Sequence, residues 1–319
     1  MLLSRFETKQ MARMHAQHSA FRFATGVGSP GPTVSPDSPT TAPDCSTPSC
    51  FSEFAQVTVQ GIGLVEMPKL QLGDKILTTS GYEAIYGFAH NDTSSQAQFL
   101  QIYTRVGSKP LEVSGDHLLF VVGTTHPVRA SSIRIGDTLA GEEDELIVSK
   151  VRKVKRKGLY APLTPSGTIL VDGIAASCYV SLQPHSPGNV ELKGGLSTWL
   201  SHHFIVHTWL SPIRIVCVGI SANLCSSYDS DTGLAHFALA GFSCFDVFQR
   251  QSLLVQACLL LIFFSSFGTL RVLEYVVGAE NAFWALLVGL VVGLTWRRRR
   301  ASWNDGCKRK SFGTKEGTS

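Results

Sequence analysis

From Cys50 to about residue 185, the chain consists of short apolar runs separated by Gly, Asp and Pro. Examples are "QFLQIYTRVG", "HLLFVVG" and "GTILVDG", which are rich in β-branched residues and closely spaced. Short runs of this composition are typical of strands that end in tight turns. We therefore predict a mainly β domain that begins at Cys50 and ends near residue 185.

Two segments of this region share one pattern. "LQLGDKIL" (70–77) and "IRIGDTLA" (133–140) both place a Gly-Asp pair between apolar residues. A Gly-Asp pair suits a tight turn that leads into a strand. Two copies of such a unit favour a domain built from two similar halves. The alternative is a coincidental pair of β-turns.

The segment before Cys50 has a different composition. Residues 27–49 are mostly Pro, Ser, Thr and Gly without an apolar period, which is typical of a linker that cannot bury enough surface to become ordered. We predict a disordered or linker segment over residues 1–49, and a tail with no role of its own is the alternative. Residues 1–26 lack the unbroken apolar core of a secretory signal. Either the chain is not secreted by that route or its true start is missing.

Charge and cysteine usage exclude several classes of function. A net charge of +4 on 319 residues is too weak to indicate a nucleic-acid partner, because four of the arginines form one run. The cysteines form no CxxC or Cys/His zinc spacing, so we predict no metal site and no cofactor. They do not identify a redox compartment. Their positions are 45, 50, 178, 217, 225, 244, 258 and 307.

The first of two apolar runs near the C-terminus has the length of a membrane span. Residues 251–270, "QSLLVQACLLLIFFSSFGTL", are uncharged and lie between Arg250 and Arg271. A bilayer requires roughly 20 apolar residues in a helix. The run therefore indicates membrane association.

The second apolar run, residues 281–296, is shorter and ends at Trp296, which the arginine run follows. An interfacial Trp beside clustered Arg is typical of the cytosolic membrane boundary. We predict a membrane-associated hairpin or two helices over residues 250–300, with a polar tail over 301–319. A hairpin that enters one leaflet and a soluble helical pair remain alternatives. The chain should be membrane-associated in a compartment that the sequence does not identify.

The turn-rich stretch "QPHSPGNVELKGGLS" (183–197) follows the β region and leads into the segment 186–249 that precedes the apolar runs. A later stretch, residues 202–225, mixes histidines, Arg214 and Pro212 into apolar sequence. This mixture favours an amphipathic interfacial helix over a membrane span. We therefore predict a linker and an interfacial helical segment over residues 186–249.

The position of Cys50 suggests chemistry on the chain itself. A thiol at the first residue of a domain lies beside the peptide bond that joins the domain to its linker. Attack of the Cys50 sulfur on the Ser49 carbonyl would convert that amide into a thioester, which water or another nucleophile can then cleave. The amide is resonance-stabilised, so a second group must protonate or twist the departing nitrogen.

Three other residues of the β region have suitable chemistry. In "SGDHLLFV", His117 can donate or accept a proton near neutral pH, and the Ser114 hydroxyl can orient the amide or bind an oxyanion. In "AASCYVSL", Cys178 is a candidate for a second proton-transfer or stabilising group. The alternatives are a strand-end histidine bonded to a backbone carbonyl and a cysteine that fills the core.

Four motifs in this order resemble the Hint domain of Hedgehog proteins and related Hog proteins. They are "CF" at the domain start, "SGDHLLFV", "HPVRASSIRIGDTL" and "YAPLTPSGTILVDGIAASCYVSL". The resemblance runs from Cys50 to about Leu182, less than half of the chain. It implies a two-subdomain, horseshoe-shaped β domain that cleaves itself from whatever precedes its first cysteine.

The resemblance also implies roles for single residues. Cys50 is the expected nucleophile, and His117 is the histidine expected to assist the N-to-S acyl shift. Ser114 stands where the family usually has threonine, and Cys178 stands at the family's C-terminal catalytic cysteine. Ser49 stands where Hedgehog has glycine, on the other side of the scissile bond.

One departure from the family concerns the second step of the reaction. "YGFAHND" (86–92) matches the segment in which Hedgehog carries an aspartate that activates the sterol hydroxyl, and this chain has His90 there. A histidine can also deprotonate an alcohol or water, so His90 is a candidate base for the second step. The alternative is a surface histidine on a loop. The acceptor is either water or an alcohol or lipid drawn from the membrane.

We predict a single-turnover, cysteine-dependent autoprocessing peptidase whose substrate is its own N-terminal segment. Intein-like splicing would need a terminal His-Asn before Cys, Ser or Thr, and no such triplet follows Cys178. A protease that acts in trans would need an open cleft, whereas Cys50 directly follows a tethered bond. The remaining alternative is a catalytically silent, membrane-anchored structural or binding module with the same fold.

Overall fold

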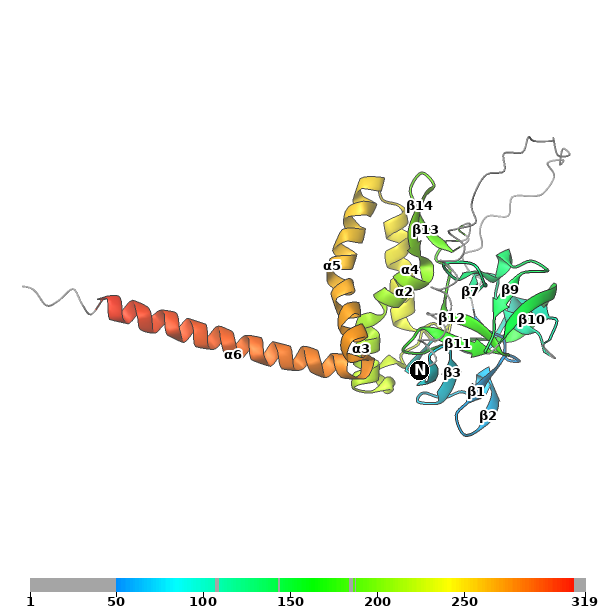
Figure 1. Ribbon diagram of the computed structural model, residues 1–319, viewed down its shortest axis with the longest axis horizontal. Coiled ribbons are helices and arrows are strands. Elements are labelled where there is room, and N and C mark those ends of the chain that lie inside the picture. Colours follow the sequence, from blue (N-terminus) through cyan, green and yellow to red (C-terminus); the bar gives the residue numbers. More distant parts are fainter. Residues whose placement is uncertain (1–49, 107–108, 143, 184–185, 187, 313–319) are drawn as a thin grey trace, which may run out of the picture.

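The computed structural model describes residues 50–106, 109–142, 144–183, 186 and 188–312 (Figure 1). Side chains are described as far as Arg297 within the last of these ranges. Ser49, the linker predicted over residues 1–49 and the end of the predicted polar tail lie outside the described residues.

The described strands form four antiparallel sheets. The strand orders are β2-β1-β3-β4, β6-β5-β10-β9, β11-β12-β7-β8 and β13-β14. The bounds are β1 (Gln56–Val59), β2 (Gly63–Glu66), β3 (Lys75–Thr78), β4 (Gly81–Ala84), β5 (Gly87–Thr104), β6 (Leu111–Val113), β7 (His117–Leu119), β8 (Val128–Arg129), β9 (Thr138–Ala140), β10 (Glu145–Leu163), β11 (Thr168–Val171), β12 (Ile174–Val180), β13 (Asn189–Leu192) and β14 (Leu196–Ser201). The mainly β fold predicted from Cys50 onwards is confirmed.

The pair of β5 and β10 is the axis of the β domain. The two strands have 18 and 19 residues and pair along nearly their whole length. The register shifts at three places, and such shifts bend a strand pair and increase its twist. The last six residues of β10, 158–163, are all buried, so this end of the strand is covered on both faces.

The Gly-Asp repeat has the same backbone geometry in both copies. Gly73 and Gly136 have φ values of 89° and 96°, a region that glycine adopts without steric cost. The N–H of Gly73 donates to the carbonyl of Ile85, and the N–H of Gly136 donates to the carbonyl of Val148, both at 2.9 Å. Each glycine therefore ends a turn and begins a strand pairing.

The aspartates of the two copies also match. The carboxylate of Asp74 accepts from the N–H of Gln71 at 2.8 Å, and that of Asp137 accepts from the N–H of Arg134 at 2.8 Å. Such Asx bonds close the turn from the side-chain side. The two halves predicted from the sequence are thus built from the same turn unit.

The helices follow the β domain and lie to one side of it, and α6 projects away from the rest (Figure 1). Two 3-10 turns, η1 (Met67–Lys69) and η2 (Ala130–Ser132), precede the Gly-Asp units. The later elements are α2 (His202–Trp209), α3 (Ser211–Gly219), η3 (Ala222–Cys225), α4 (His236–Gln249), α5 (Leu253–Val277) and α6 (Ala279–Phe312).

The prediction of one amphipathic interfacial helix over residues 202–225 is wrong. The stretch forms α2, α3 and η3, and Pro212 lies in the first turn of α3, where its missing N–H is tolerated. Its polar side chains His202, His207 and Arg214 are buried rather than exposed at an interface. The linker predicted before it contains the β13–β14 hairpin.

The two apolar runs form helices, as predicted. Leu253–Val277 and Ala279–Arg297 are long and apolar enough to cross a membrane by length and composition. The 25 residues of α5 span about 38 Å at 1.5 Å per residue, against a hydrocarbon core of about 30 Å. Most side chains of both segments are exposed.

A buried ion pair joins α5 to the two short helices. Nε and Nη2 of Arg214 donate to the two carboxylate oxygens of Glu274 at 2.9 and 2.7 Å. The hydroxyl of Ser211 donates to the same carboxylate at 2.8 Å, and Arg214 also donates to the carbonyl of His207 at 3.1 Å. Both charged side chains are almost completely inaccessible. A two-pronged, fully bonded pair of this kind is favourable in a buried setting.

Loss of one partner of this pair should destabilise the fold strongly. Glu274→Gln leaves the Arg214 charge buried without compensation, and we expect a loss of about 3–5 kcal/mol in the free energy of unfolding. The control is Asp246→Asn, which removes the exposed pair with Arg250 and should cost less than about 1 kcal/mol. Chemical denaturation of the detergent-solubilised chain measures both. Equal effects of the two substitutions would contradict the importance of the buried pair.

Candidate active site

Cys50 is buried at the start of the described chain because the next residue is tied into two strands. Phe51 forms bridges with Tyr160 of β10 and Val113 of β6. Its N–H donates to the carbonyl of Tyr160 at 2.9 Å, and the N–H of Tyr160 donates back at 3.1 Å. The Phe51 side chain is completely buried in the main core. The backbone of Cys50 therefore has a fixed position.

The thiol of Cys50 contacts His90. The distance from Cys50 Sγ to His90 Nδ1 is 3.1 Å, and the other ring nitrogen, Nε2, donates to the carbonyl of Thr232 at 2.7 Å. His90 is buried on β5, so it is not a surface histidine on a loop. The structure thus brings together the predicted nucleophile and the residue predicted as the base of the second step.

Burial keeps this pair uncharged near neutral pH. Desolvation, together with the carboxylate of Asp92, raises the pKa of the Cys50 thiol well above its ordinary value. Desolvation also lowers the pKa of His90. A protonated thiol therefore faces a neutral imidazole, and the proton has to move during the reaction rather than before it.

Ser114 and His117 lie on a turn that is bonded to Cys50. The N–H of Ser114 donates to the carbonyl of Cys50 at 3.0 Å, and the N–H of His117 donates to the carbonyl of Ser114 at 3.2 Å. Both side chains are buried, and the Ser114 hydroxyl has no hydrogen-bond partner among the described residues. Three of the predicted residues are therefore adjacent in space.

The ring of His117 is held by one nitrogen. Its Nε2 donates to the carbonyl of Ser177 at 2.7 Å, and its ring centroid lies 4.2 Å from that of Phe51. Its Nδ1 is buried and has no hydrogen-bond partner in the described part of the chain. Burial lowers the pKa of His117 to about 4, so the ring is neutral at pH 7 with a free acceptor nitrogen.

Cys178 has different surroundings. It lies on β12 in the main core, whereas Cys50 packs in a separate small cluster with Phe99, Leu159 and Ala161. The Cys178 sulfur lies 3.4 Å from the Thr164 hydroxyl, and burial raises its pKa to about 12. The contacts described for Cys178 do not include the other predicted site residues.

Two features of the site had no recognised signal in the sequence. The charge of Asp92, on β5, acts on Cys50 and His90, although Asp92 was not among the predicted site residues. Thr232 contributes only a backbone carbonyl, which no residue type can reveal, and it lies in a predicted linker. Among the described residues, no group of three or more His, Cys, Asp or Glu side chains could hold a metal ion.

The chain is similar to several known proteins. The family model described as "Hint module" matches residues 37–216. Protein qua-1 of Caenorhabditis elegans is 30% identical over 165 residues, which are 43% of this chain and 14% of that protein. Sonic hedgehog protein of Danio rerio is 29% identical over 151 residues, which are 42% of this chain and 36% of that protein.

Protein hedgehog of Drosophila yakuba is 26% identical over 223 residues, which are 64% of this chain and 45% of that protein. The chain thus matches less than half the length of each of these relatives. Among solved structures, the gp41-1 intein is similar with 18% identity and a TM-score of 0.36, over 40% of this chain and 98% of that one.

The matched range of the family model begins before Cys50 and continues past the predicted domain end near residue 185. It covers more than half of the 319 residues. The chain therefore belongs to the Hint family, and its Hint domain is of the Hedgehog and Hog type.

Proposed function

We propose that this chain cleaves itself at the Ser49–Cys50 bond through an N-to-S acyl shift. The observation that carries the proposal is the 3.1 Å contact between the Cys50 sulfur and His90 Nδ1, at the first residue of the folded domain. A nucleophile beside a base in a buried site is the arrangement that covalent catalysis requires. Membership of the Hint family and the similarity to Hedgehog proteins support the same reaction.

In the first step, the Cys50 sulfur forms a bond with the carbonyl carbon of Ser49. The thiol proton passes to His90 Nδ1, because the thiol is protonated at neutral pH and its proton must leave as the sulfur attacks. The bond from that carbon to the Cys50 nitrogen then breaks, and the nitrogen takes up the proton. The net change is one proton moved from sulfur to nitrogen and an amide exchanged for a thioester.

His117 and Ser114 assist the departure of the nitrogen in this proposal. The free Nδ1 of neutral His117 can accept from the N–H of the scissile amide and hold the amide twisted out of its plane, which weakens its resonance. The unpartnered Ser114 hydroxyl can donate to the oxygen on which negative charge develops. We assign Cys178 a stabilising role in β12, since the adjacent carbonyl of Ser177 holds the His117 ring.

The second step transfers the acyl group from sulfur to an acceptor. Once His90 has given up its proton, its Nδ1 is again a base and can deprotonate water, or an alcohol, that attacks the thioester. The bond from the acyl carbon to the Cys50 sulfur then breaks, and the departing sulfur takes this proton back from His90. The buried position of His90 beside Cys50 supports this second role. The acceptor is water or a lipid alcohol, and the released product is the N-terminal segment.

We further propose that α5 and α6 anchor the domain in a membrane. The observation that favours this second function is the exposure of large apolar side chains along both helices, for example Leu254 and Leu261 at 75% and 72%. Exposed apolar surface of this extent marks an interaction site. Trp296 and Arg297 at the end of the second segment suit a membrane boundary.

The alternative to self-cleavage is that the Hint domain is catalytically silent and serves as a membrane-anchored structural or binding module.

The cleavage prediction is tested with an N-terminally tagged full chain followed by gel and intact mass. We expect the wild type to release a fragment that ends at Ser49, faster with added thiol, and Cys50→Ala to stay whole. Cys244→Ala removes an exposed free cysteine and should cleave like the wild type. His117→Ala should lower the rate of cleavage by about 100-fold or more.

The mass of the released fragment identifies water or a heavier alcohol as the acceptor. An intact wild type with added thiol would indicate the silent module.

The pH dependence of cleavage should reflect the low pKa values of both histidines. Burial lowers the pKa of His90, and that of His117 to about 4, from 6.5, so each ring stays neutral and active below pH 6.5. We expect the rate of thioester formation, measured at saturating thiol, to fall only at a pH clearly below 6.5. A midpoint at or above 6.5 would contradict the burial of these bases.

Fold stability provides the control for this pH series. The unfolded chain takes up protons on these histidines as the pH falls through 6.5, whereas the folded chain does so only near its lower pKa values. Their contribution to stability is thus complete above pH 6.5 and is lost as the pH falls below 6.5, in the case of His117 through its folded-state pKa of about 4. Thermal melts at each pH separate this loss from a change in the chemistry.

Membrane anchoring is tested by carbonate extraction of membranes that carry the full chain. We expect the wild type to resist extraction and Leu261→Arg/Ile262→Arg to be released, because both side chains are exposed toward the middle of Leu253–Val277 and an arginine near the centre of a span costs roughly 2.5–3.5 kcal/mol. Ile62→Arg is the matched control, since Ile62 is 72% exposed on the β domain. Release of the wild type together with the double variant would show that the helices are not an anchor.

A further inference from the structure

A short segment after the matched Hint range pairs with the strand that carries His90. Residues 226–235, here named the strap, connect η3 to α4. The N–H of Ala235 donates to the carbonyl of Ala89 at 3.0 Å, and the N–H of Asn91 donates to the carbonyl of Gly233 at 3.0 Å. These bonds flank His90 on both sides. The strap therefore lies along β5 at the point where the strand reaches the active site.

The strap also contacts the His90 ring. A carbonyl oxygen can only accept, so the 2.7 Å contact between His90 Nε2 and the Thr232 carbonyl places the ring proton on Nε2. The other nitrogen, Nδ1, then carries a lone pair and faces the Cys50 sulfur. Fixing the tautomer in this way makes Nδ1 the base, just as an oriented partner fixes the catalytic histidine in serine proteases.

Bonds within the strap hold the Thr232 carbonyl in place. The Asp229 carboxylate accepts from the N–H and the hydroxyl of Thr232 at 2.9 and 2.7 Å. The N–H of Asp229 donates to the carbonyl of Leu234 at 2.8 Å, and the N–H of Gly233 donates to that of Asp229 at 2.9 Å. The turn is thus closed both by its backbone and by one carboxylate.

Gly233 allows the strap to approach β5 closely. Its φ of +68° lies in the left-handed region, and a Cβ there would meet the Asp92 Cβ at 2.8 Å and the Asn91 oxygen at 3.0 Å. A side chain at this position would therefore push the strap away from the strand. The close approach is what brings the preceding residue, Thr232, within hydrogen-bond distance of the ring.

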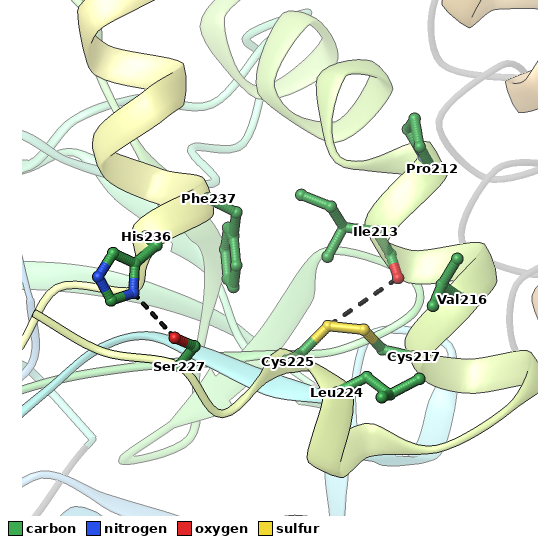
Figure 2. Close-up of a pocket in the computed structure, with 9 residues that line it drawn as sticks. All are labelled: Pro212, Ile213, Val216, Cys217, Leu224, Cys225, Ser227, His236 and Phe237. Carbon is green, nitrogen blue, oxygen red and sulfur yellow. Dashed lines mark hydrogen bonds between the residues drawn. A yellow bond between two sulfur atoms is a disulfide. The ribbon is translucent and has the colours of Figure 1, made fainter.

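The base of the strap is anchored on both sides (Figure 2). The N–H of His236 donates to the carbonyl of Ser227 at 3.1 Å, and their side chains are 2.9 Å apart. Just before the strap, Cys225 forms a disulfide with Cys217 of α3. An apolar pocket of about 410 Å³ lies between these two anchors. The disulfide ties the start of the strap to α3, a helix that is itself fixed by buried side chains such as Arg214 and Ile215.

We propose that the strap is a positioning element of the active site, which selects the Nε2–H tautomer of His90 through the Thr232 carbonyl. Its consequence for the rate of thioester formation rests on the proposed self-cleavage, whereas the His90 tautomer does not. The strap lies beyond residues 37–216, the matched Hint range, so the helical half of the chain completes the catalytic site of the β half. The Cys217–Cys225 disulfide holds the strap in register with β5.

The first test reads the tautomer directly and needs no cleavage. In the Cys50→Ala full chain with ¹⁵N-labelled histidine, the His90 signals, assigned with His90→Gln, should have the pattern of the Nε2–H form. Gly233→Ala and Asp229→Asn should shift this pattern toward a mixture of tautomers. Gly194→Ala is the matched control, because Gly194 has a φ of +90° with nothing within 4 Å of its Cβ position. An unchanged pattern in both strap variants would overturn the proposal.

The second test measures cleavage by the same variants on the Cys50 background. We expect Gly233→Ala, and more mildly Asp229→Asn, to lower the rate of thioester formation by about 10- to 100-fold and to move the acid limb of its pH profile. Gly194→Ala should stay within twofold of the wild type with an unmoved limb. Cys217→Ala should behave like Asp229→Asn. Strap variants with the wild-type rate and profile would refute the positioning role.

The two tests separate the failure of one proposal from that of the other. If the wild type does not cleave while the strap variants change the His90 tautomer, the positioning role stands and self-cleavage fails. If the wild type cleaves and the strap variants cleave equally fast, self-cleavage stands and the positioning role fails. If Gly233→Ala does not fold, Asp229→Asn decides the outcome, because it removes only a side-chain charge from an exposed turn.

Discussion

The exchange of backbone hydrogen bonds between Phe51 and Tyr160 is the constraint on which the site depends. It fixes the first residues of the domain at the buried end of β10, so that Cys50 has one position relative to the turn of Ser114 and His117. Without this pairing, a cysteine at the start of the domain would sample many positions, and the entropy of fixing it would add to the barrier of the reaction. Here Cys50 is already fixed in the folded domain, and burial of the Phe51 ring helps to offset the loss of conformational entropy.

Burial then determines the electrostatics of the site. It raises the pKa of the thiol and lowers that of both histidines, so that a neutral donor faces neutral acceptors. Such a site is inert until a peptide carbonyl lies within reach of the sulfur, since no free thiolate is present to react elsewhere. The peptide bond that precedes Cys50 is kept next to this sulfur because the two are covalently joined. Burial thus favours reaction on the chain's own backbone.

The helical half of the chain is bound to the β half by polar contacts as well as by apolar packing. The ion pair of Arg214 and Glu274 fastens α5 to α3, and the strap reaches from η3 to β5. A helix with an exposed apolar surface is thereby linked through α3 and a disulfide to the residues around His90. The proposed membrane anchor α5 is therefore connected to the Cys50–His90 site, for which a lipid alcohol is one of the proposed acceptors.

By itself, the sequence determined the class of the fold and named four of the residues that lie together at the site, Cys50, His90, Ser114 and His117. The short β-branched runs and the two Gly-Asp units depend on the strand and turn preferences of neighbouring residues, which the sequence shows directly. The same holds for Cys50, Ser114 and His117, whose motifs are short and ordered. The two apolar helices were also visible, because length and composition define them.

Only the tertiary structure decided how distant segments meet. His90 and Thr232 are separated by 142 positions, and the contact uses a backbone carbonyl that every residue possesses. The stretch 202–225 looked interfacial because its charges interrupt apolar sequence, yet Arg214 finds its partner in Glu274, 60 positions later. Whether a polar residue is exposed or buried depends on a partner that the fold supplies, and no local pattern contains that information.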